Sequence, residues 1–189
     1  MRIAVLALQG AFIEHEQMLE RLGAECFEVR RLADWEHEKD GLVIPGGEST
    51  TQLRLLKDLG LLEPVRDYIN GGGAVFGTCA GLIQLAKKVR GEDFARISTM
   101  DIEVCRNAYG RQLGSFFTEA EMEGIGKVPM TFIRAPYIEQ VHGDAKALAV
   151  VDGRIVAARQ GRQLVTAFHP ELCDDTRVHE YFLHDVVGK

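Results

Sequence analysis

Long apolar runs and an excess of basic residues are both missing from this 189-residue sequence. No stretch reaches the roughly 18 consecutive apolar residues that a membrane-spanning helix needs, so we expect no membrane association. The formal net charge is -6. This acidic balance argues against nucleic acid or an anionic membrane as the main partner.

Paired cysteines are missing as well. The chain has no Cys-x-x-Cys pair, no zinc-binding spacing and no phosphate-binding loop pattern, so we expect neither a metal nor another cofactor. Cysteines without the regular spacing of a disulfide framework are typical of reduced thiols in the cytoplasm. The four cysteines are Cys26, Cys79, Cys105 and Cys173.

What remains has the composition of one soluble domain over residues 1–189. The hydrophobic fraction is 46% and the charged fraction 26%, both ordinary values for a globular protein. Residues 1–8 are apolar enough to suggest a signal peptide, but the run is short and ends at Gln9 and Gly10 without a small-x-small cleavage pattern. We therefore expect a buried strand there and a cytoplasmic protein.

Strand and helix patterns alternate in the first half of the chain. Short apolar runs, typical of parallel strands covered on both faces, are separated by segments with helical spacing of their apolar residues. Residues 49–51 are candidates to cap a helix. The expected strands are 3–8, 24–29, 41–44 and 74–76, and the expected helices are 11–22, 49–59, 64–70 and one that begins near residue 80.

Beyond about residue 90 the pattern changes to short strands joined by turns. Asp152-Gly153 and Gln160-Gly161 predict hairpin turns, and residues 175–187 predict an amphipathic helix. The whole pattern predicts an α/β protein with an open, mostly parallel sheet flanked by helices and an added antiparallel part. The strand-like segments are 115–118, 131–133, 147–151, 154–158 and 163–168.

A reactive cysteine is indicated directly after the apolar run 74–76. The segment Gly77-Thr78-Cys79-Ala80-Gly81 has the small-x-nucleophile-x-small pattern of a nucleophile elbow, a sharp turn between a strand and a helix. At the N-terminus of a helix, the dipole and the free N–H groups favour a thiolate. A buried structural cysteine in a glycine-rich turn is the alternative interpretation.

His169 is the best candidate for an acid or base that works with this cysteine. It follows an apolar strand, and Pro170 favours an extended backbone before it. A histidine can protonate the nitrogen that leaves an attacked amide, and Glu171 could orient the imidazole and stabilise its charged form. The remaining histidines, for which solvated faces are expected, are His15, His37, His142, His179 and His184.

Two further features lie in loops beside strands. The amides of Pro45-Gly46-Gly47 are unshielded by side chains, and with the amide of Ala80 they could bind an oxyanion; an ordinary turn is the alternative. Arg106 and Arg134 could each hold a carboxylate in bidentate fashion. Surface charge is the alternative for both arginines, and the sequence leaves both interpretations open.

Taken together, these segments resemble the class I (triad) glutamine amidotransferases, which have a flavodoxin-like fold. Residues 77–81 and 168–171 carry the resemblance to that class. The segments that contain Arg106 and Arg134 narrow it to the glutaminase subunits of pyridoxal 5′-phosphate synthase complexes. The matching segments, in the order of that family, are 6–10, 45–51, 106–112, 132–136 and 168–172.

The resemblance implies a role for each matched residue. Cys79 would be the nucleophile and His169 with Glu171 would complete the triad of a glutaminase. Such an enzyme hydrolyses L-glutamine to L-glutamate and ammonia through a γ-glutamyl thioester on Cys79. The implied glutamine-binding residues are Gly47, Glu48, Ser49, Arg106, Ile133 and Arg134, and the implied oxyanion-hole residues are Gly46, Gly47 and Ala80.

The resemblance also implies a partner. The glutaminase would join a synthase subunit of (β/α)8-barrel fold in a hetero-oligomeric complex. There the ammonia would combine with a pentose phosphate and a triose phosphate to give pyridoxal 5′-phosphate. The alternatives are a glutaminase for another biosynthetic pathway, a cysteine peptidase or redox sensor of similar fold, and a binding module without activity.

Overall fold

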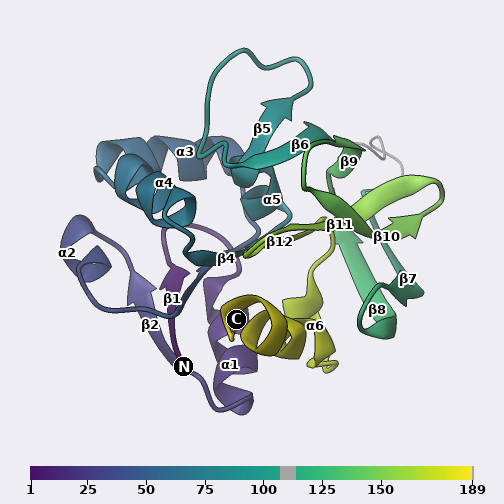
Figure 1. Cartoon of the computed structure of the whole chain (residues 1–189), viewed down its shortest axis with the longest axis horizontal. Helices are drawn as coiled ribbons and strands as arrows, with labels where there is room; N and C mark the ends of the chain where they lie inside the picture. Colours follow the sequence, from purple (N-terminus) through teal and green to yellow (C-terminus); the bar gives the residue numbers. More distant parts are fainter. Residues whose placement is uncertain (107–113, 189) are drawn as a thin grey trace.

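One continuous sheet runs through the molecule, as the computed structural model shows for residues 1–106 and 114–188 (Figure 1). The strand order is β2-β1-β3-β4-β12-β11-β10-β7-β8, and β5, β6 and β9 join the sheet off this path. The expected α/β class, with a mostly parallel part and an added antiparallel part, is confirmed. No helix among the described residues is long and apolar enough to span a bilayer.

The parallel part consists of β2, β1, β3, β4 and β12. β4 lies between β3 and β12, and all its residues are buried, which explains its uninterrupted apolar sequence. The carboxyl ends of these strands point to one edge, where ligands bind in open α/β sheets. The bounds are β1 (Arg2–Leu6), β2 (Glu25–Val29), β3 (Gly41–Ile44), β4 (Ala74–Thr78) and β12 (Gln163–Thr166).

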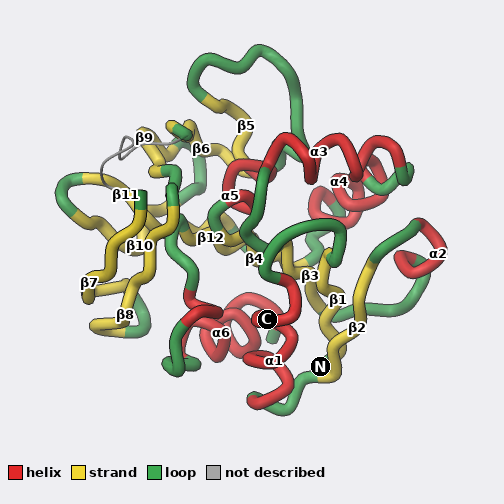
Figure 2. The backbone as a smooth tube through the Cα atoms, turned by 180° about the vertical axis from the view of Figure 1, so that it is seen from behind, coloured by secondary structure: helices red, strands yellow, loops and turns green. Residues whose placement is uncertain are grey.

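Helices cover both faces of the parallel part, with α3, α4 and α5 on one face and α1 and α6 on the other (Figures 1 and 2). The cap of α3 differs from expectation: the Glu48 carboxylate, rather than a hydroxyl of residues 49–51, accepts the first free amides. The α-helices are α1 (Phe12–Arg21), α2 (Leu32–Trp35), α3 (Ser49–Asp58), α4 (Leu62–Asn70), α5 (Ala80–Leu85) and α6 (Arg177–Tyr181). A 3-10 turn, η1 (Pro170–Leu172), precedes α6, and a π-helix, η2 (Phe182–Val187), continues it.

The antiparallel part is larger than the sequence predicted. β7 and β8 pair along their whole length, so residues 119–122 and 126–130 are strand where only shorter segments were expected. β5, β6 and β9 were not predicted. The bounds are β5 (Ala86–Val89), β6 (Met100–Cys105), β7 (Ser115–Met122), β8 (Gly126–Ile133), β9 (Tyr137–Val141), β10 (Lys146–Val151) and β11 (Arg154–Gln160).

The two predicted hairpin turns have different outcomes. Asp152 and Gly153 join β10 to β11 with φ angles of 49° and 75°, the left-handed conformation that a type I′ turn needs at both positions, so this prediction is confirmed. The second turn lies one residue later than expected. Gln160 still belongs to β11, and Gly161 with Arg162 makes the connection to β12.

Candidate active site

Cys79 occupies the turn between β4 and α5 in a strained backbone conformation. Its φ is 49° and its ψ is -98°, a region that non-glycine residues rarely adopt and that costs about 1–3 kcal/mol. The amide of Cys79 donates to the Thr166 carbonyl at 2.8 Å, which ties the turn to β12. The predicted elbow is therefore present in the structure.

The glycines on either side of Cys79 are required by close backbone contacts. A Cβ on Gly77 would lie 2.8 Å from the carbonyl of Gly81. A Cβ on Gly81 would lie 2.1 Å from the Ile44 carbonyl oxygen of β3, well inside van der Waals contact. The sequence spacing thus reflects a turn that packs directly on the neighbouring strand.

His169 and Glu171 form a buried pair at the end of β12. The Nδ1 of His169 lies 2.7 Å from Oε1 of Glu171, and the His169 amide donates to the Thr131 carbonyl of β8 at 2.8 Å. Burial acts to lower the pKa of His169, but hydrogen bonds to Cys79 and Glu171 outweigh it and raise the pKa to about 10. Because Nδ1 of His169 is bonded to Glu171, Nε2 is the ring nitrogen that can form the hydrogen bond with Cys79.

The carboxylate of Glu171 is kept ionised by its neighbours. Burial acts to raise its pKa, whereas its interactions with His15 and His169, including the hydrogen bond with His169, lower it. A charged carboxylate behind a charged imidazole is the electrostatic arrangement that supports a thiolate nucleophile.

A cavity of about 610 Å³ opens in front of Cys79 and His169, within the size range of small-molecule sites. Ala80 and Glu171 lie behind its wall and do not line it. The other predicted site residues that line it are Gly46, Gly47, Glu48, Ser49, Arg106, Ile133 and Arg134.

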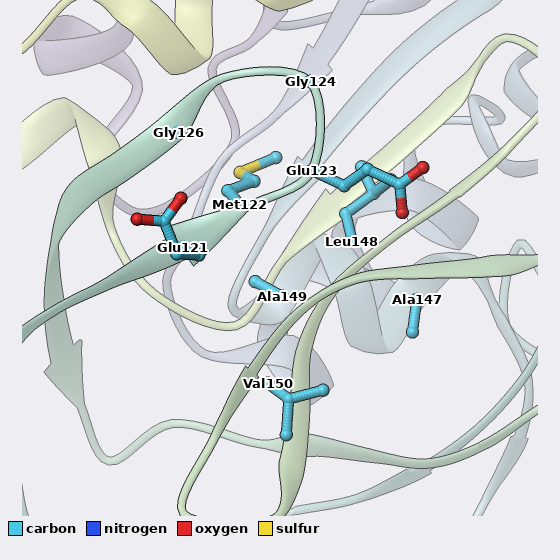
Figure 3. Close-up of a pocket in the computed structure, with 9 residues that line it drawn as sticks. All are labelled: Glu121, Met122, Glu123, Gly124, Gly126, Ala147, Leu148, Ala149 and Val150. Carbon is cyan, nitrogen blue, oxygen red and sulfur yellow. The ribbon is translucent and has the colours of Figure 1, made fainter.

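A second hollow, of about 670 Å³, lies between the end of the β7–β8 hairpin and β10 (Figure 3). Its walls contain no cysteine, histidine or cationic side chain, and its only charged groups are Glu121 and Glu123. None of the predicted site residues lies there, so the smaller cavity at Cys79 is the candidate active site.

The loop that follows β3 runs along one wall of the cavity. The Gly46 amide donates to Thr78 Oγ1 at 3.0 Å, and the Gly46 carbonyl accepts from the Ala11 amide at 3.0 Å. A Cβ on Gly46 would lie 2.4 Å from Cε1 of His169, so only glycine allows the imidazole to lie against this loop. No described residue forms a hydrogen bond with the Gly47 amide.

Gln9 holds the other side of this loop and was not among the predicted site residues. Its Oε1 accepts from the Glu48 amide at 2.7 Å, and its carbonyl accepts from Gln52 Nε2 at 3.1 Å. The position of Gln9 at the carboxyl end of β1 was the available signal, since side chains at that edge of the sheet surround the site.

The two predicted arginines have different surroundings. Arg106 lies 2.6 Å from Glu92 and 3.6 Å from Glu48, so its charge is already balanced by carboxylates. Arg134 is exposed at the cavity and forms no ion pair with a described residue; its φ is 44°. Residues 107–112, the rest of the segment that contains Arg106, lie outside the described residues.

The expectation of solvated faces was wrong for two histidines. His15 and His179 are both fully buried, and His15 Nε2 lies 3.5 Å from Glu171 Oε2. The sequence held a signal for His15, because it shares the apolar helix face of Phe12 and Leu19, and a histidine on a buried face needs a polar partner. No cluster of three or more metal-binding side chains occurs in the described parts of the chain.

Solved structures place this architecture among the glutamine amidotransferases. A structure described as a glutamine amidotransferase superimposes with a TM-score of 0.93 at 42% sequence identity and covers 99% of each chain. A glutamine amidotransferase from Thermotoga maritima aligns with a TM-score of 0.63 at 14% identity over 98% of this chain and 82% of that one. The second likeness concerns the fold alone.

Sequence comparison narrows the class to one family. The profile of the SNO glutamine amidotransferase family matches residues 5–188, and the chain belongs to that family. A relative from Methanocorpusculum labreanum, named pyridoxal 5′-phosphate synthase subunit PdxT, is 58% identical over 100% of this chain and 99% of its own length. One of the same name from Streptococcus pneumoniae is 54% identical over 97% of this chain and 96% of its own length.

Proposed function

We propose that the chain is a glutaminase that hydrolyses L-glutamine to L-glutamate and ammonia for a pyridoxal 5′-phosphate synthase. The observation that carries the proposal is the buried pair of His169 and Glu171, 2.7 Å apart, beside a cysteine at a strained elbow. The family, described as glutamine amidotransferases, supports an activity on glutamine, and the name of the relatives supports the link to a pyridoxal 5′-phosphate synthase. We propose that residues 1–189 act as a single glutaminase domain.

In the proposed reaction the thiolate of Cys79 attacks the carboxamide carbon of glutamine. His169, with its pKa raised to about 10, carries the proton that leaves with ammonia, and a γ-glutamyl thioester remains on Cys79. His169 then accepts a proton from water, which attacks the thioester and releases glutamate. Glu171 keeps the imidazole oriented and stabilises its cationic form in both steps.

The oxyanion is proposed to be bound by backbone amides of Gly46, Gly47 and Ala80. Ala80 follows the nucleophile directly, as the second donor does in other nucleophile elbows. The Gly47 amide is free of described partners, which supports its role. The Gly46 amide donates to Thr78 Oγ1, so it can donate to the oxyanion only after that hydrogen bond is broken.

Charge distribution suggests how the amino-acid end of glutamine is held. Arg134 has no described ion-pair partner, so we assign it the α-carboxylate of glutamine. Arg106 is balanced by Glu92 and Glu48 and is proposed to shape the wall. Ser49, whose buried Oγ has no hydrogen-bond partner in the described chain, is available to the substrate. Gly47, Glu48 and Ile133 are proposed to complete the binding surface.

The proposed partner is a synthase subunit of (β/α)8-barrel fold that receives the ammonia in a hetero-oligomeric complex. The relatives' name, which makes each of them part of a synthase, supports a partner. A cytoplasmic location is proposed because all four cysteines are free thiols, which suits a reducing compartment. The acidic net charge of -6 supports a partner other than nucleic acid.

The proposal is tested by measuring glutamate release from glutamine by the purified chain, alone and with the synthase subunit from the same genome. We expect release that increases when the synthase is added, and loss of release in Cys79→Ala with folding preserved. Glutamate release by Cys79→Ala near the wild-type rate would rule out the proposed mechanism. Full release by the isolated chain, unchanged by the synthase, would rule out dependence on the partner.

A further inference from the structure

Two histidines from opposite ends of the chain meet behind the catalytic pair. α1 and α6 lie side by side on one face of the sheet (Figures 1 and 2). His15 of α1 and His179 of α6 are joined by a hydrogen bond of 2.9 Å between Nδ1 of His15 and Nε2 of His179. Both side chains are fully buried, so neither can exchange this partner for water.

The other ring nitrogen of His15 faces the active site. Nε2 of His15 lies 3.0 Å from Thr78 Oγ1 and 3.5 Å from Oε2 of Glu171. Thr78 directly precedes the nucleophile, and its Oγ1 also accepts the amide of Gly46. His15 therefore contacts both Thr78 and the triad carboxylate, and Thr78 in turn links it to the oxyanion loop.

The hydrogen bonds indicate the direction in which the protons point. Nδ1 of His179 is buried and has no hydrogen-bond partner among the described residues. A buried N–H without an acceptor is rarer than an acceptor without a donor, so Nδ1 carries no proton and Nε2 of His179 donates to His15. With Nδ1 of His15 accepting, the only ring proton of neutral His15 is on Nε2, directed at Thr78 and Glu171.

Neutral imidazoles are consistent with this assignment. Burial lowers the pKa of His15 against the opposing effect of Glu171, and burial, together with the neighbouring His15, lowers the pKa of His179 well below its ordinary value. Each ring thus has one donor and one acceptor. The two rings form a chain of donors that starts at His179 and ends between Thr78 and Glu171.

We propose that His15, oriented by His179, is a positioning residue of the active site: its Nε2–H donates to the Thr78 hydroxyl and lies against the Glu171 carboxylate, and so keeps both in the arrangement that catalysis needs. Oε2 of Glu171 accepts no hydrogen bond from the described residues, so the polar Nε2–H of His15 at 3.5 Å is the group that stabilises it. Without His15 the carboxylate could rotate away from His169. This inference rests on the proposed glutaminase function and extends its catalytic site to a second layer of residues.

The test separates the two ring nitrogens of His15. The amide nitrogen of glutamine can replace Nε2–H, whereas the shorter asparagine reaches only the position of Nδ1. In the complex with the synthase subunit, His15→Asn and His15→Leu should lower kcat for glutamate release about tenfold or more, the usual effect of losing a partner that orients a site residue. His15→Gln should keep kcat near wild type. KM for glutamine should change little in all of them, because His15 does not line the cavity.

A packing control distinguishes positioning from stability. The ring of Phe76 packs edge-on against both imidazoles, at 5.8 Å from His15 and 5.6 Å from His179, without any hydrogen bond to them. Phe76→Leu should lower the unfolding midpoint while kcat stays near wild type. Equal losses of kcat in Phe76→Leu, His15→Gln and His15→Asn would overturn the proposal and leave His15 a packing residue.

Two variants of His179 test the proposal if the His15 variants fail to fold. His179→Gln keeps a donor for Nδ1 of His15 and should retain kcat, whereas His179→Leu removes it and should lower kcat with KM unchanged. Equal kcat for these two variants would overturn the proposal. Failure of the function itself gives a different result, because the wild-type complex would then release no glutamate or Cys79→Ala would remain active.

Discussion

Two residues that line the cavity have strained backbone conformations. The non-glycine residues with positive φ among those described are Cys79, Ser98, Arg134 and Asp152, and Cys79 and Arg134 both line the cavity. Such conformations persist only where the surroundings impose them. The proposed nucleophile and the proposed carboxylate-binding arginine are thus held in place by their backbones.

Gly81, two residues after Cys79, should be intolerant of any side chain. In Gly81→Ala the new Cβ would lie 2.1 Å from the Ile44 carbonyl oxygen, and neither backbone can give way easily, so we expect a loss of more than about 2 kcal/mol in the free energy of unfolding. Gly91→Ala is the control, since its Cβ meets nothing within 4 Å and only a φ of 77° opposes it. Urea denaturation measures both; equal losses would contradict the packing argument.

The two arginines of the cavity should differ in their effect on substrate binding. Arg134→Met removes a charge that no described carboxylate balances, so KM for glutamine should rise about 10- to 100-fold, as expected for loss of a charged hydrogen bond. Arg106→Met should raise KM less, because Glu92 and Glu48 already balance Arg106. Steady-state kinetics with the synthase subunit present measures both, and a larger rise for Arg106→Met would reverse the assignment.

At the scale of elements, local patterns were predictable and long-range contacts were not. The elbow after β4 and the hairpin turn at Asp152 follow from short segments whose residue types dictate the backbone. β6 carries an alternating burial pattern that the sequence also contains, so it could have been found. β5 begins directly where α5 ends, and only its pairing with β6 makes it a strand.

The same difference between local patterns and long-range contacts applies to the site residues. Cys79, His169 and Glu171 could be predicted because each stands in a segment with its own chemical pattern, and the rule for open α/β sheets places such segments at one edge. The contact of His15 with His179 joins residues 164 positions apart. Nothing in either helix predicts that contact, because it depends on how α1 and α6 pack on the sheet.

The β10–β11 turn permits a prediction at this scale. Asp152→Val places a β-branched residue at a φ of 49°, so the free energy of unfolding should fall by about 1–2 kcal/mol. Asp152→Asn should leave it nearly unchanged, because asparagine tolerates the left-handed conformation. Thermal or urea unfolding measures the difference, and glutaminase activity should be retained in both variants. Equal stability of the two variants would contradict the turn assignment.

For the whole molecule, the stability should depend on pH through the catalytic pair. The pKa of His169 is raised from 6.5 to about 10 by Cys79 and Glu171 against the effect of burial. Between about pH 6.5 and pH 10, the folded chain therefore holds a proton on His169 that the unfolded chain has lost. The stabilisation is complete below about pH 6.5 and is lost as the pH rises towards about 10.

Glu171→Gln tests this dependence because it removes the negative charge that raises the pKa of His169 and leaves only a weaker, neutral acceptor for Nδ1. In this variant the free energy of unfolding should fall over a narrower pH range than in the wild type, and the fall should end below about pH 10. Urea denaturation at a series of pH values measures both proteins. A wild-type stability that does not decline across this window would show that the pair is not charged as described.

The hydrogen bond from the His169 amide to the Thr131 carbonyl has a consequence for the modularity of this fold. The parallel half supplies the proposed nucleophile, and β8 of the antiparallel half anchors His169, ends at Ile133 and leads directly into Arg134. A chimera that received its antiparallel half from a distant relative would therefore exchange part of the catalytic machinery along with the substrate wall. We expect the two halves to be inherited as one unit, and specificity to change through substitutions within them and not through recombination between them.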